Sequence, residues 1–331
     1  MRTLNYLHSA AWFLPVRILL SIVYFFLTEM RNRFYDWGVL PIHRIDTPIV
    51  SVGNISAGGS GKTIMVQTLI RFFQDNHMSP AVLSRGYGRE TKGLLLVADK
   101  NGLNNDVRSS GDEPYLIARN CPGIPVLVSE DRALGAKYLL EESHPDVIIL
   151  DDGFQHRRLY RDLDILLYDR QKDIPSHILP WGNLRESEKN TRRADLILNS
   201  KSGLQGNVSH DFVVEIADKL VGYDGEMLSF SDVSGSYGLF AGLGNNPSFF
   251  SAVESVLGIP KNKHSFPDHT SYSVNQRNKI LESDCDIWIT TQKDFVKLNP
   301  GFCEENNIYY LPVMAKAPGA LELLLKQYFK L

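Results

Sequence analysis

The sequence contains few cysteines and has no excess of basic charge. Three cysteines are spread singly over 331 residues, at Cys121, Cys285 and Cys303, and none belongs to a Cys-x-x-Cys pair. This usage argues against a zinc ribbon or a disulfide framework and suits a reducing compartment. With 35 Lys and Arg against 38 Asp and Glu, the formal net charge is −3. Because nucleic acids are usually bound through a basic face, we expect no nucleic-acid partner.

A hydrophobic run long enough to span a bilayer is also missing from the N-terminal region. The apolar segment Ile18 to Leu27 is far shorter than the roughly 20 residues that a transmembrane helix needs. No small-residue cleavage site follows it, so we expect no signal peptide. Two interpretations remain open, a helix that packs on the first domain and a helix that lies in a membrane surface. On a helix, the polar residues of this region form one stripe on an otherwise apolar surface: Arg17, Ser21, Tyr24, Thr28 and Arg31.

The most informative motif is a glycine-rich turn between a strand-like segment and a helical one. Thr47 to Val52 is typical of a buried strand, and Ile64 to Phe73 is apolar at helical spacing. This context indicates a phosphate-binding loop, in which backbone amides converge on an anion at a helix N-terminus. Lys62 would contact the β- and γ-phosphates and Thr63 would hold Mg²⁺, although Ser56 stands where the usual pattern has Gly. The predicted nucleotide-binding residues are Ser56, Ala57, Gly58, Gly59, Ser60, Gly61, Lys62 and Thr63.

Short apolar runs alternate with helical segments after this loop. Helical periodicity covers residues 113–120 and 130–142. The apolar runs do not alternate with polar residues, which is typical of strands buried on both faces of a parallel sheet. They lie at residues 81–84, 124–128, 147–150, 165–168 and 196–198. The pattern predicts an α/β fold, with a doubly wound, mainly parallel sheet of the P-loop NTPase type and a second, smaller α/β domain.

We expect four regions along the chain, because 331 residues suffice for two domains. The predicted regions are an N-terminal apolar, amphipathic helix region at 1–40, a P-loop core domain at 41–205, a linking ribbon at 206–232 and a smaller C-terminal α/β domain at 233–331. The ribbon would be built from residues 212–216 and 226–230.

Two pairs of acidic residues are candidates for phosphoryl-transfer chemistry. Asp151 and Asp152 follow the apolar run Val147 to Leu150, a position at which phosphate-loop enzymes engage Mg²⁺. Asp112 and Glu113 precede a helical run, so Asp112 is either the N-cap of that helix or a base that accepts the proton of an attacking hydroxyl. A helix or turn cap is the alternative for Asp151 and Asp152 as well.

Four further motifs are ambiguous on their own. The loop at 84–89 carries two arginines beside flexible glycines and suits phosphate or sugar contacts. The segments 184–186 (Leu-Arg-Glu) and 266–269 (Phe-Pro-Asp-His) contain charged residues that can equally be structural. The segment 290–294 is similar to the base-reading Asn-Lys-x-Asp pattern of GTPases in only two residues.

Taken together and in this order, the motifs resemble the tetraacyldisaccharide 4′-kinase (lipid A 4′-kinase) family of Gram-negative bacteria. The resemblance extends from the apolar N-terminal helix to the closing segments. The family carries Ser or Thr at the position of Ser56, so this departure from the general loop pattern is expected. The motifs that carry the resemblance are Ser51–Thr63, Ser84–Arg89, Gly111–Pro114, Asp151–His156, Leu184–Glu186, Phe266–His269 and Thr291–Asp294.

The resemblance implies transfer of the γ-phosphoryl group of ATP to the 4′-hydroxyl of tetraacyldisaccharide 1-phosphate, which forms lipid IVA in lipid A biosynthesis. ATP and Mg²⁺ are the implied cofactors, and the implied partner is a lipid substrate at the cytoplasmic face of the inner membrane. The resemblance therefore favours the membrane-surface interpretation of the N-terminal helix. We also expect a monomer.

The resemblance also implies a set of site residues. Asp112 would act as the base with assistance from His269, and Lys62 would stabilise the transferred phosphoryl group. Mg²⁺ and its surroundings would be served by Thr63, Asp151, Asp152 and Glu186. The expected substrate-binding residues are Arg85, Tyr87, Arg89 and Arg185.

Two alternatives compete with a kinase. A regulatory ATPase or GTPase switch of the deviant phosphate-loop group would carry Lys immediately before Gly58, where this chain has Ala57. A metal-delivery GTPase would need Cys or His ligands near the loop. Neither alternative explains the apolar N-terminal segment.

Overall fold

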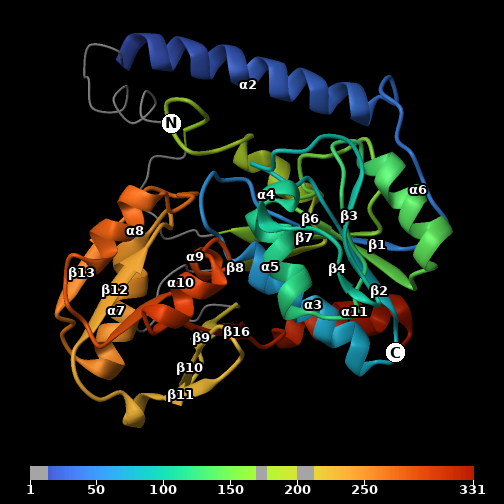
Figure 1. Cartoon of the computed structure of the whole chain (residues 1–331). Helices are drawn as coiled ribbons and strands as arrows, with labels where there is room; N and C mark the ends of the chain where they lie inside the picture. The colour runs from blue at the N-terminus through green and yellow to red at the C-terminus, as the bar shows by residue number, and fades with distance from the viewer. Residues whose placement is uncertain (1–13, 169–176, 200–211) are drawn as a thin grey trace.

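The computed structural model describes residues 14–168, 177–199 and 212–331. They form two α/β units that lie beside each other, with one long helix along the larger unit (Figure 1). The expected boundary between residues 205 and 206 lies outside the described residues, as do the first 13 residues of the N-terminal region. The four predicted regions therefore stay a prediction.

The larger unit is built on an eight-stranded sheet with the order β4-β3-β5-β2-β6-β1-β7-β8. All pairings are parallel except those of β3 with β4 and with β5, so the expected mainly parallel sheet is confirmed. The strands are β1 (Ile49–Gly53), β2 (Pro80–Ser84), β3 (Leu95–Asp99), β4 (Gly102–Leu103), β5 (Val126–Val128), β6 (Val147–Asp151), β7 (Leu163–Tyr168) and β8 (Leu196–Asn199).

Helices cover both faces of this sheet because its central strands are apolar on both sides. Along β1, Val50 and Val52 join one buried cluster with α3, whereas Ile49 joins another with α6. Such strands need a helix layer on each side. The helices of this unit are α3 (Lys62–Asp75), α4 (Val107–Ser110), α5 (Asp112–Asn120) and α6 (Arg132–Ser143), with a 3₁₀ helix η2 (Glu188–Arg193) before β8.

The smaller unit has a six-stranded sheet with the order β11-β10-β15-β14-β12-β13. Its strands are β10 (Lys219–Val221), β11 (Met227–Ser229), β12 (Tyr237–Ala241), β13 (Asn262–Ser265), β14 (Ile287–Thr291) and β15 (Ile308–Leu311). Its helices are η3 (Phe230–Asp232), α7 (Asn246–Leu257), α8 (Val274–Leu281), α9 (Gln292–Phe295) and α10 (Pro300–Glu305). Buried aromatic residues fill this core, including Phe240, Trp288 and Phe295.

The expected linking ribbon is paired differently from the prediction. β9 (Val214–Ile216) pairs with β16 (Val313–Ala315) near the C-terminus, and β11 pairs with β10 inside the smaller sheet. The two expected ribbon segments therefore do not pair with each other. The partner of β9 comes from about a hundred residues later in the chain, which local pattern cannot reveal.

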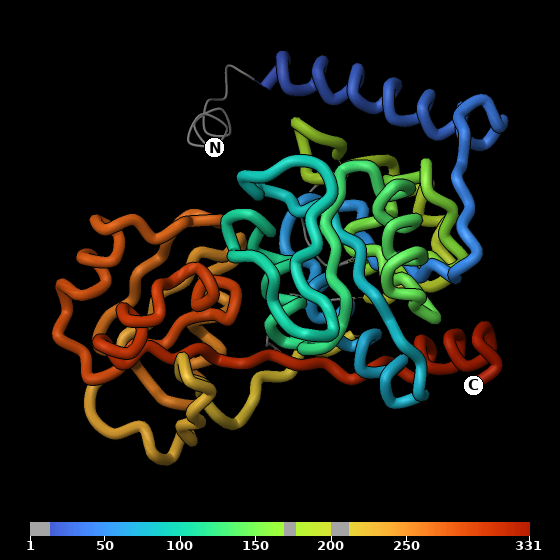
Figure 2. The backbone as a smooth tube through the Cα atoms, turned by 45° about the vertical axis from the view of Figure 1, so that its right-hand side comes forward, coloured from blue at the N-terminus to red at the C-terminus, as the bar shows by residue number. Residues whose placement is uncertain are grey.

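After β16 the chain returns to the larger unit, as the red C-terminal segment shows in Figure 2. The closing helix α11 (Gly319–Phe329) buries Leu321 and Leu325 in the same cluster as Leu69 and Phe73 of α3. The segment 233–331 thus contributes to both cores.

The N-terminal helix α2 (Leu14–Asp36) lies along the edge of the larger unit (Figure 1). Its buried residues are the polar Ser21, Thr28 and Asn32, two of which belong to the expected polar stripe. Apolar side chains on the rest of the helix are exposed, including Leu19 and Phe26 at 61% and 64%. Among the described residues no helix combines the length and the apolar character needed to cross a membrane.

Candidate active site

The glycine-rich loop connects the end of β1 to the first residue of α3. Gly58 and Gly61 have φ angles of +121° and +80°, a region that glycine enters without strain. Asn54 at the start of the loop donates to Ser60 Oγ at 2.9 Å and closes the turn. A Cβ atom added at Gly58 or at Gly59 would meet nothing within 4 Å, so the loop is open on the side of these glycines. This arrangement leaves backbone amides at a helix N-terminus accessible to an anion.

The two aspartates that end β6 have different surroundings. Asp151 is 1% exposed, and its Oδ2 accepts a hydrogen bond from Ser84 Oγ at 2.9 Å. Burial, followed by the charges of Glu113 and Asp152, raises the pKa of Asp151 to about 7. Its Oδ1 is buried and has no hydrogen-bond partner among the described residues. A buried carboxylate oxygen without a partner is costly unless a cation completes the site.

Asp152 is held by two cations. Arg185 Nη1 lies 2.8 Å from Oδ2 of Asp152, and Lys62 Nζ lies 3.5 Å from its Oδ1. Burial favours a higher pKa for Asp152, but the charges of Lys62 and Arg185 outweigh it and lower the pKa. Asp152 also has a φ angle of +52°, which a non-glycine residue adopts only when its surroundings enforce it. Lys62 therefore connects the phosphate-binding loop directly to the expected metal site.

The donor set at the end of β6 fits Mg²⁺. This ion keeps several waters and takes one or two protein carboxylates together with substrate phosphates. Within residues 14–168, 177–199 and 212–331, no group of three or more His, Cys, Asp and Glu side chains is arranged to hold a metal. Asp151 Oδ1 supplies an unused oxygen, and Thr63 stands at the start of α3 next to Lys62.

The expected base and its assistant come together from the two units. Asp112 is the first residue of α5 in the larger unit, and His269 follows β13 in the smaller one. His269 Nδ1 lies 3.1 Å from Asp112 Oδ2, and Lys297 Nζ lies 3.2 Å from the same oxygen. Burial favours a raised pKa for Asp112, but the hydrogen bond to His269 and the charge of Lys297 outweigh it and lower the pKa. Asp112 thus stays ionised and can accept a proton.

A second bridge joins the units beside this pair. Lys293 Nζ lies 3.6 Å from Glu113 Oε1 and 3.4 Å from Asp268 Oδ1. Burial disfavours the charged form of Lys293, but the charges of Glu113 and Asp268 outweigh it and raise its pKa. The residues of the smaller unit that contact α5 come from α9, the turn after it and the loop after β13, so these segments connect the smaller unit to α5.

The four expected substrate-binding residues occupy different environments. Tyr87 is 65% exposed, and its ring centroid lies 5.9 Å from that of His269. Arg185 is engaged by Asp152, as described above. The side chain of Arg89 is buried and forms an ion pair with Glu130 at 2.7 Å, so Arg89 stabilises its own loop at 84–89. Arg85 directly follows β2 and is exposed. Its charge adds to the effect of burial in lowering the pKa of Arg132. Tyr87 and Arg85 are therefore the members of the set that stay accessible.

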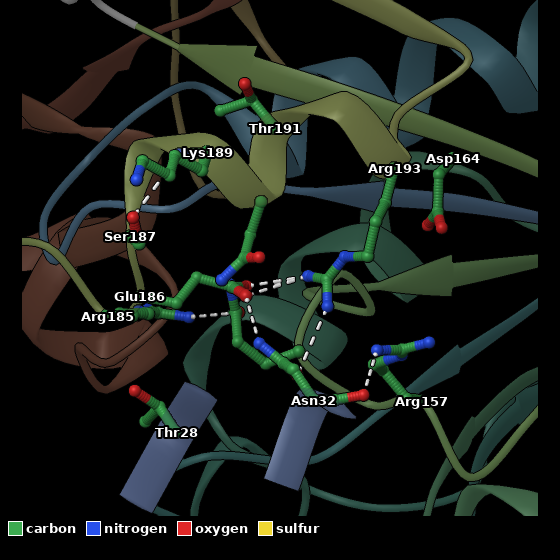
Figure 3. Close-up of polar contacts among 12 residues, drawn as sticks. Thr28, Asn32, Arg157, Asp164, Arg185, Glu186, Ser187, Lys189, Thr191 and Arg193 are labelled. Carbon is green, nitrogen blue, oxygen red and sulfur yellow. Dashed lines mark hydrogen bonds and ion pairs between the residues drawn. The ribbon is translucent and has the colours of Figure 1, made fainter. Parts of the chain in front are cut away.

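Glu186 lies at the centre of a buried hydrogen-bond network (Figure 3). Both of its carboxylate oxygens accept from Arg193 Nη2 at 2.9 Å. Asn32 Nδ2 of α2 donates to its Oε2 at 3.1 Å, and Gln155 Nε2 donates to its Oε1 at 2.9 Å. These four contacts engage both oxygens with neutral or positive donors. The predicted part of Glu186 in Mg²⁺ binding therefore gains no support from its contacts and stays a prediction.

The segment around Glu186 links α2 to the phosphate-binding loop. Ser21 Oγ of α2 donates to the carbonyl of Ile178 at 2.6 Å, and Arg17 Nη2 donates to those of Pro180 and Trp181 at 3.0 Å. On its other side the segment pairs with the loop, because Ala57 N donates to Asn183 O at 2.7 Å. The polar stripe of α2 is thus the face that packs on the larger unit.

Sequence reasoning missed some residues of the site and misjudged one motif. Asp294 has no exposure, accepts from Gly242 N at 2.8 Å and from Thr291 Oγ1 at 2.7 Å, and has a structural role. The similarity of this motif to a base-reading pattern was therefore misleading. Lys297 was not considered, although its position four residues after Lys293 places both ammonium groups toward α5. The partner of Asp151, Ser84, was also missed.

The fold and the site define a P-loop protein that binds a nucleoside triphosphate and carries an ionised carboxylate at the interface between its two units. The model of the family described as tetraacyldisaccharide-1-P 4′-kinase matches residues 11–330. The chain belongs to this family, and the resemblance drawn from its motifs is confirmed.

Relatives and a solved structure agree with this assignment. The chain is 40% identical over 286 residues to the tetraacyldisaccharide 4′-kinase of Aquifex aeolicus, covering 84% of this chain and 88% of that protein. It is 33% identical over 319 residues to the enzyme of the same name from Mannheimia succiniciproducens, covering 96% and 94%. A crystal structure of LpxK from Aquifex aeolicus in complex with ATP is similar with a TM-score of 0.79 and 37% identity, covering 94% of this chain and 98% of that one.

Proposed function

We propose that the protein transfers the γ-phosphoryl group of ATP to the 4′-hydroxyl of tetraacyldisaccharide 1-phosphate and so forms lipid IVA. The observation that carries this proposal is the Asp112–His269 contact, which joins the two units beside Glu113, a residue whose charge acts on Asp151 at the end of β6. A regulatory switch would need no hydroxyl-activating base at this place. Family membership and the ATP-bound relative support the same reaction.

In the proposed reaction, the 4′-oxygen bonds to the γ-phosphorus while the bond from this phosphorus to the bridging oxygen of ADP breaks. The hydroxyl proton passes to Asp112. His269 and Lys297 both engage Oδ2, so Oδ1 is the oxygen that accepts the proton. Proton removal comes late in a loose transition state, so the main contribution of the pair is positioning.

The loop residues bind and orient the triphosphate. The amides between Ser56 and Thr63 would contact its oxygens, and Lys62 would exchange its contact with Asp152 for one with the β- and γ-phosphates. Mg²⁺, held by Asp151 and Asp152 with Thr63, would neutralise the charge that develops on the phosphates. Closure of the second unit excludes water, which favours transfer to the lipid over hydrolysis.

We further propose that α2 lies in the cytoplasmic surface of the inner membrane, where a tetra-acylated substrate resides. Its polar stripe packs on the protein, while its apolar face points outward with Leu19, Val23 and Phe26 at 48–64% exposure. An exposed apolar helix face of this size is unusual unless a partner surface covers it. The site opening and α2 would then approach the same lipid layer. The monomeric state stays a prediction.

The deciding experiment supplies purified protein with Mg²⁺-ATP and tetraacyldisaccharide 1-phosphate in detergent micelles, and follows the phosphorylated lipid by thin-layer chromatography. We expect lipid product that depends on both ATP and Mg²⁺. The variant Lys62→Ala is the negative control, with a loss of at least about 100-fold in kcat. Hydrolysis of ATP without any lipid product would refute the proposed function.

A further inference from the structure

Two partners share one oxygen of the expected base, and only His269 was anticipated. Lys297 lies just beyond α9, its side chain is 5% exposed, and its Nζ reaches Asp112 Oδ2 at 3.2 Å across the domain interface. We propose that Lys297 is a positioning residue of the phosphoryl transfer: it keeps Asp112 anionic and turns Oδ1 toward the substrate hydroxyl. This inference rests on the proposed kinase function.

The ammonium group of Lys297 is also held by a contact within the smaller unit. Its Nζ lies 3.3 Å from Asp294 Oδ1, and Asp294 is fully buried. The other oxygen of Asp294 accepts from Gly242 N at 2.8 Å and from Thr291 Oγ1 at 2.7 Å. The ammonium group therefore stands in a defined place in the smaller unit, from which it contacts Asp112 of the larger unit. The position of the base thus depends on a contact between the two units.

The surroundings of Asp112 explain why a second cation is needed. Burial disfavours its charge, and an incoming triphosphate brings several negative charges nearby. A carboxylate that lost its counter-charge under these conditions would take up a proton and cease to act as a base. The groups that face Asp112 are Glu113 from α5, His269 and Tyr272 from the loop after β13, and Lys293, Lys297 and, through Lys297, Asp294 from α9 and the following turn.

Lys293 provides the internal comparison. It comes from the same segment and also crosses the interface, but its ammonium group contacts Glu113 and Asp268 instead of Asp112. If Lys297 merely held the units together, removal of either lysine would have similar effects. If it acts on the base, removal of Lys297 alone changes how the rate depends on protonation.

The test measures the pH dependence of kcat from pH 4.5 to 8.5 with full-length protein, Mg²⁺-ATP and lipid in mixed micelles. For Lys297→Met we expect a loss of about 10-fold or more in kcat at pH 7.5 and little change in the KM for ATP. We also expect the acid limb of the profile, which is the fall in kcat toward low pH, to have its midpoint about 1 pH unit or more higher than in the wild type. Lys297→Arg keeps the charge and is expected to leave the limb where the wild type has it. Lys293→Met is expected to move the limb less than Lys297→Met does.

A double variant separates this role from general stability. In the Asp112→Ala background, Lys297→Met is expected to cause no further loss in kcat, because the group on which it acts is gone. An unmoved acid limb in folded Lys297→Met, an equal shift in Lys293→Met, or full additivity with Asp112→Ala would each overturn the inference. If Lys297→Met does not fold, Lys297→Arg decides, since a limb moved upward despite the retained charge would contradict the proposal. A wild-type protein without lipid product would refute the kinase function itself, before any variant is compared.

Discussion

Asp151 and Asp152 are neighbours whose pKa values shift in opposite directions. Asp151 has a pKa raised to about 7 by burial and by the charges of Glu113 and Asp152, whereas Lys62 and Arg185 lower that of Asp152. A raised pKa means that the folded protein binds a proton more tightly than the unfolded chain between about pH 4 and 7, so stability is lost as the pH rises through this window. A lowered pKa stabilises the folded protein above the unfolded value and loses this contribution in acid.

These opposite shifts give a pair of matched variants. Without ligand at pH 7.5, we expect Asp151→Asn to raise the free energy of unfolding by at least about 1 kcal/mol, with the gain shrinking toward pH 5. Asp152→Asn removes a favourable charge and is expected to lower the free energy of unfolding at pH 7.5. Urea unfolding of both variants at pH 5 and 7.5 measures these changes. A stability gain of Asp151→Asn that did not depend on pH would contradict this assignment of the buried charge.

Loss of the expected base is the most direct test of the chemistry. We expect Asp112→Ala to lower kcat by at least about 100-fold, because a positioned base contributes roughly 10²–10⁴-fold. The KM for ATP should change little, since Asp112 belongs to α5 and is not one of the predicted nucleotide-binding residues at 56–63. Asp106→Ala, which removes the N-cap of the neighbouring helix α4, is the control for structural damage in this region. Turnover of Asp112→Ala near that of the wild type would reject its role as the base.

The predictions from sequence were best where a residue acts locally and weakest where it acts across the fold. Gly58 to Thr63 could be placed because the loop, its strand and its helix are contiguous. The local sequence could not decide whether Asp112 is a helix N-cap or a base. The contacts that distinguish the two roles are made with His269 and Lys297, which lie more than 150 residues away in the sequence. Glu186 was assigned to metal binding by resemblance, although its surroundings depend on Asn32 of α2 and Arg193 of η2.

The polar stripe of α2 is compatible both with packing on the larger unit and with binding of the helix to a membrane surface. Sequence periodicity revealed the stripe but left open which face meets the protein. In the structure Ser21, Thr28 and Asn32 are the buried residues of α2. Ser21 donates to the carbonyl of Ile178 and Asn32 to the carboxylate of Glu186, whereas Thr28 donates to carbonyls of its own helix. The apolar face of α2 is thereby turned outward. Packing on the protein and binding to a membrane are thus compatible functions of one helix.

Membrane binding can be tested on this outward face without disturbing the core. We expect Leu19→Ser with Phe26→Ser to lower the partition coefficient onto anionic liposomes by about 10-fold or more, since each side chain contributes roughly 1.5–3 kcal/mol when fully buried. Ile259→Ser, which changes a 94% exposed side chain of the smaller unit, is the matched control and should bind as the wild type does. Liposome sedimentation measures both. Equal binding of the double variant and the wild type would refute the proposed role of α2.

The hydrogen-bond network at Glu186 should determine how firmly α2 and η2 are held. Glu186→Ala removes the carboxylate whose two oxygens accept from Arg193 Nη2 and leaves Asn32 Nδ2 without its acceptor, so we expect a loss of about 3–5 kcal/mol in the free energy of unfolding. The exposed pair of Lys326 and Glu322 supplies the control, because Glu322→Ala should cost less than about 1 kcal/mol. Urea unfolding of the two variants gives the comparison. Similar costs for both would mean that the buried network contributes little.

The path of the whole chain explains why its domain limits were hard to predict. The sequence analysis assigned all of 233–331 to the smaller C-terminal domain, so the helix α11 at the end of this segment was expected to belong to the smaller unit. It packs instead with α3, which carries the phosphate-binding loop at its start, and β16 pairs with β9 on the way back. The smaller unit is therefore tied to the larger one at both ends, which limits how its residues His269 and Lys297 can approach Asp112.

This return of the chain predicts that the last helix stabilises the nucleotide-binding unit. Leu325 is fully buried in the cluster of α3, whereas Leu323 of the same helix is 69% exposed. We expect Leu325→Ala to lower the free energy of unfolding by about 2–5 kcal/mol, because the cavity would open beside α3, and Leu323→Ala to change it by less than about 0.5 kcal/mol. Hydrogen exchange identifies the affected unit, since the amides of α3 and β1 should lose protection in Leu325→Ala while those of β12 and β14 keep theirs. Loss of protection confined to the smaller unit would show that α11 stabilises the other core, and the coupling between the C-terminus and the phosphate-binding loop would then be wrong.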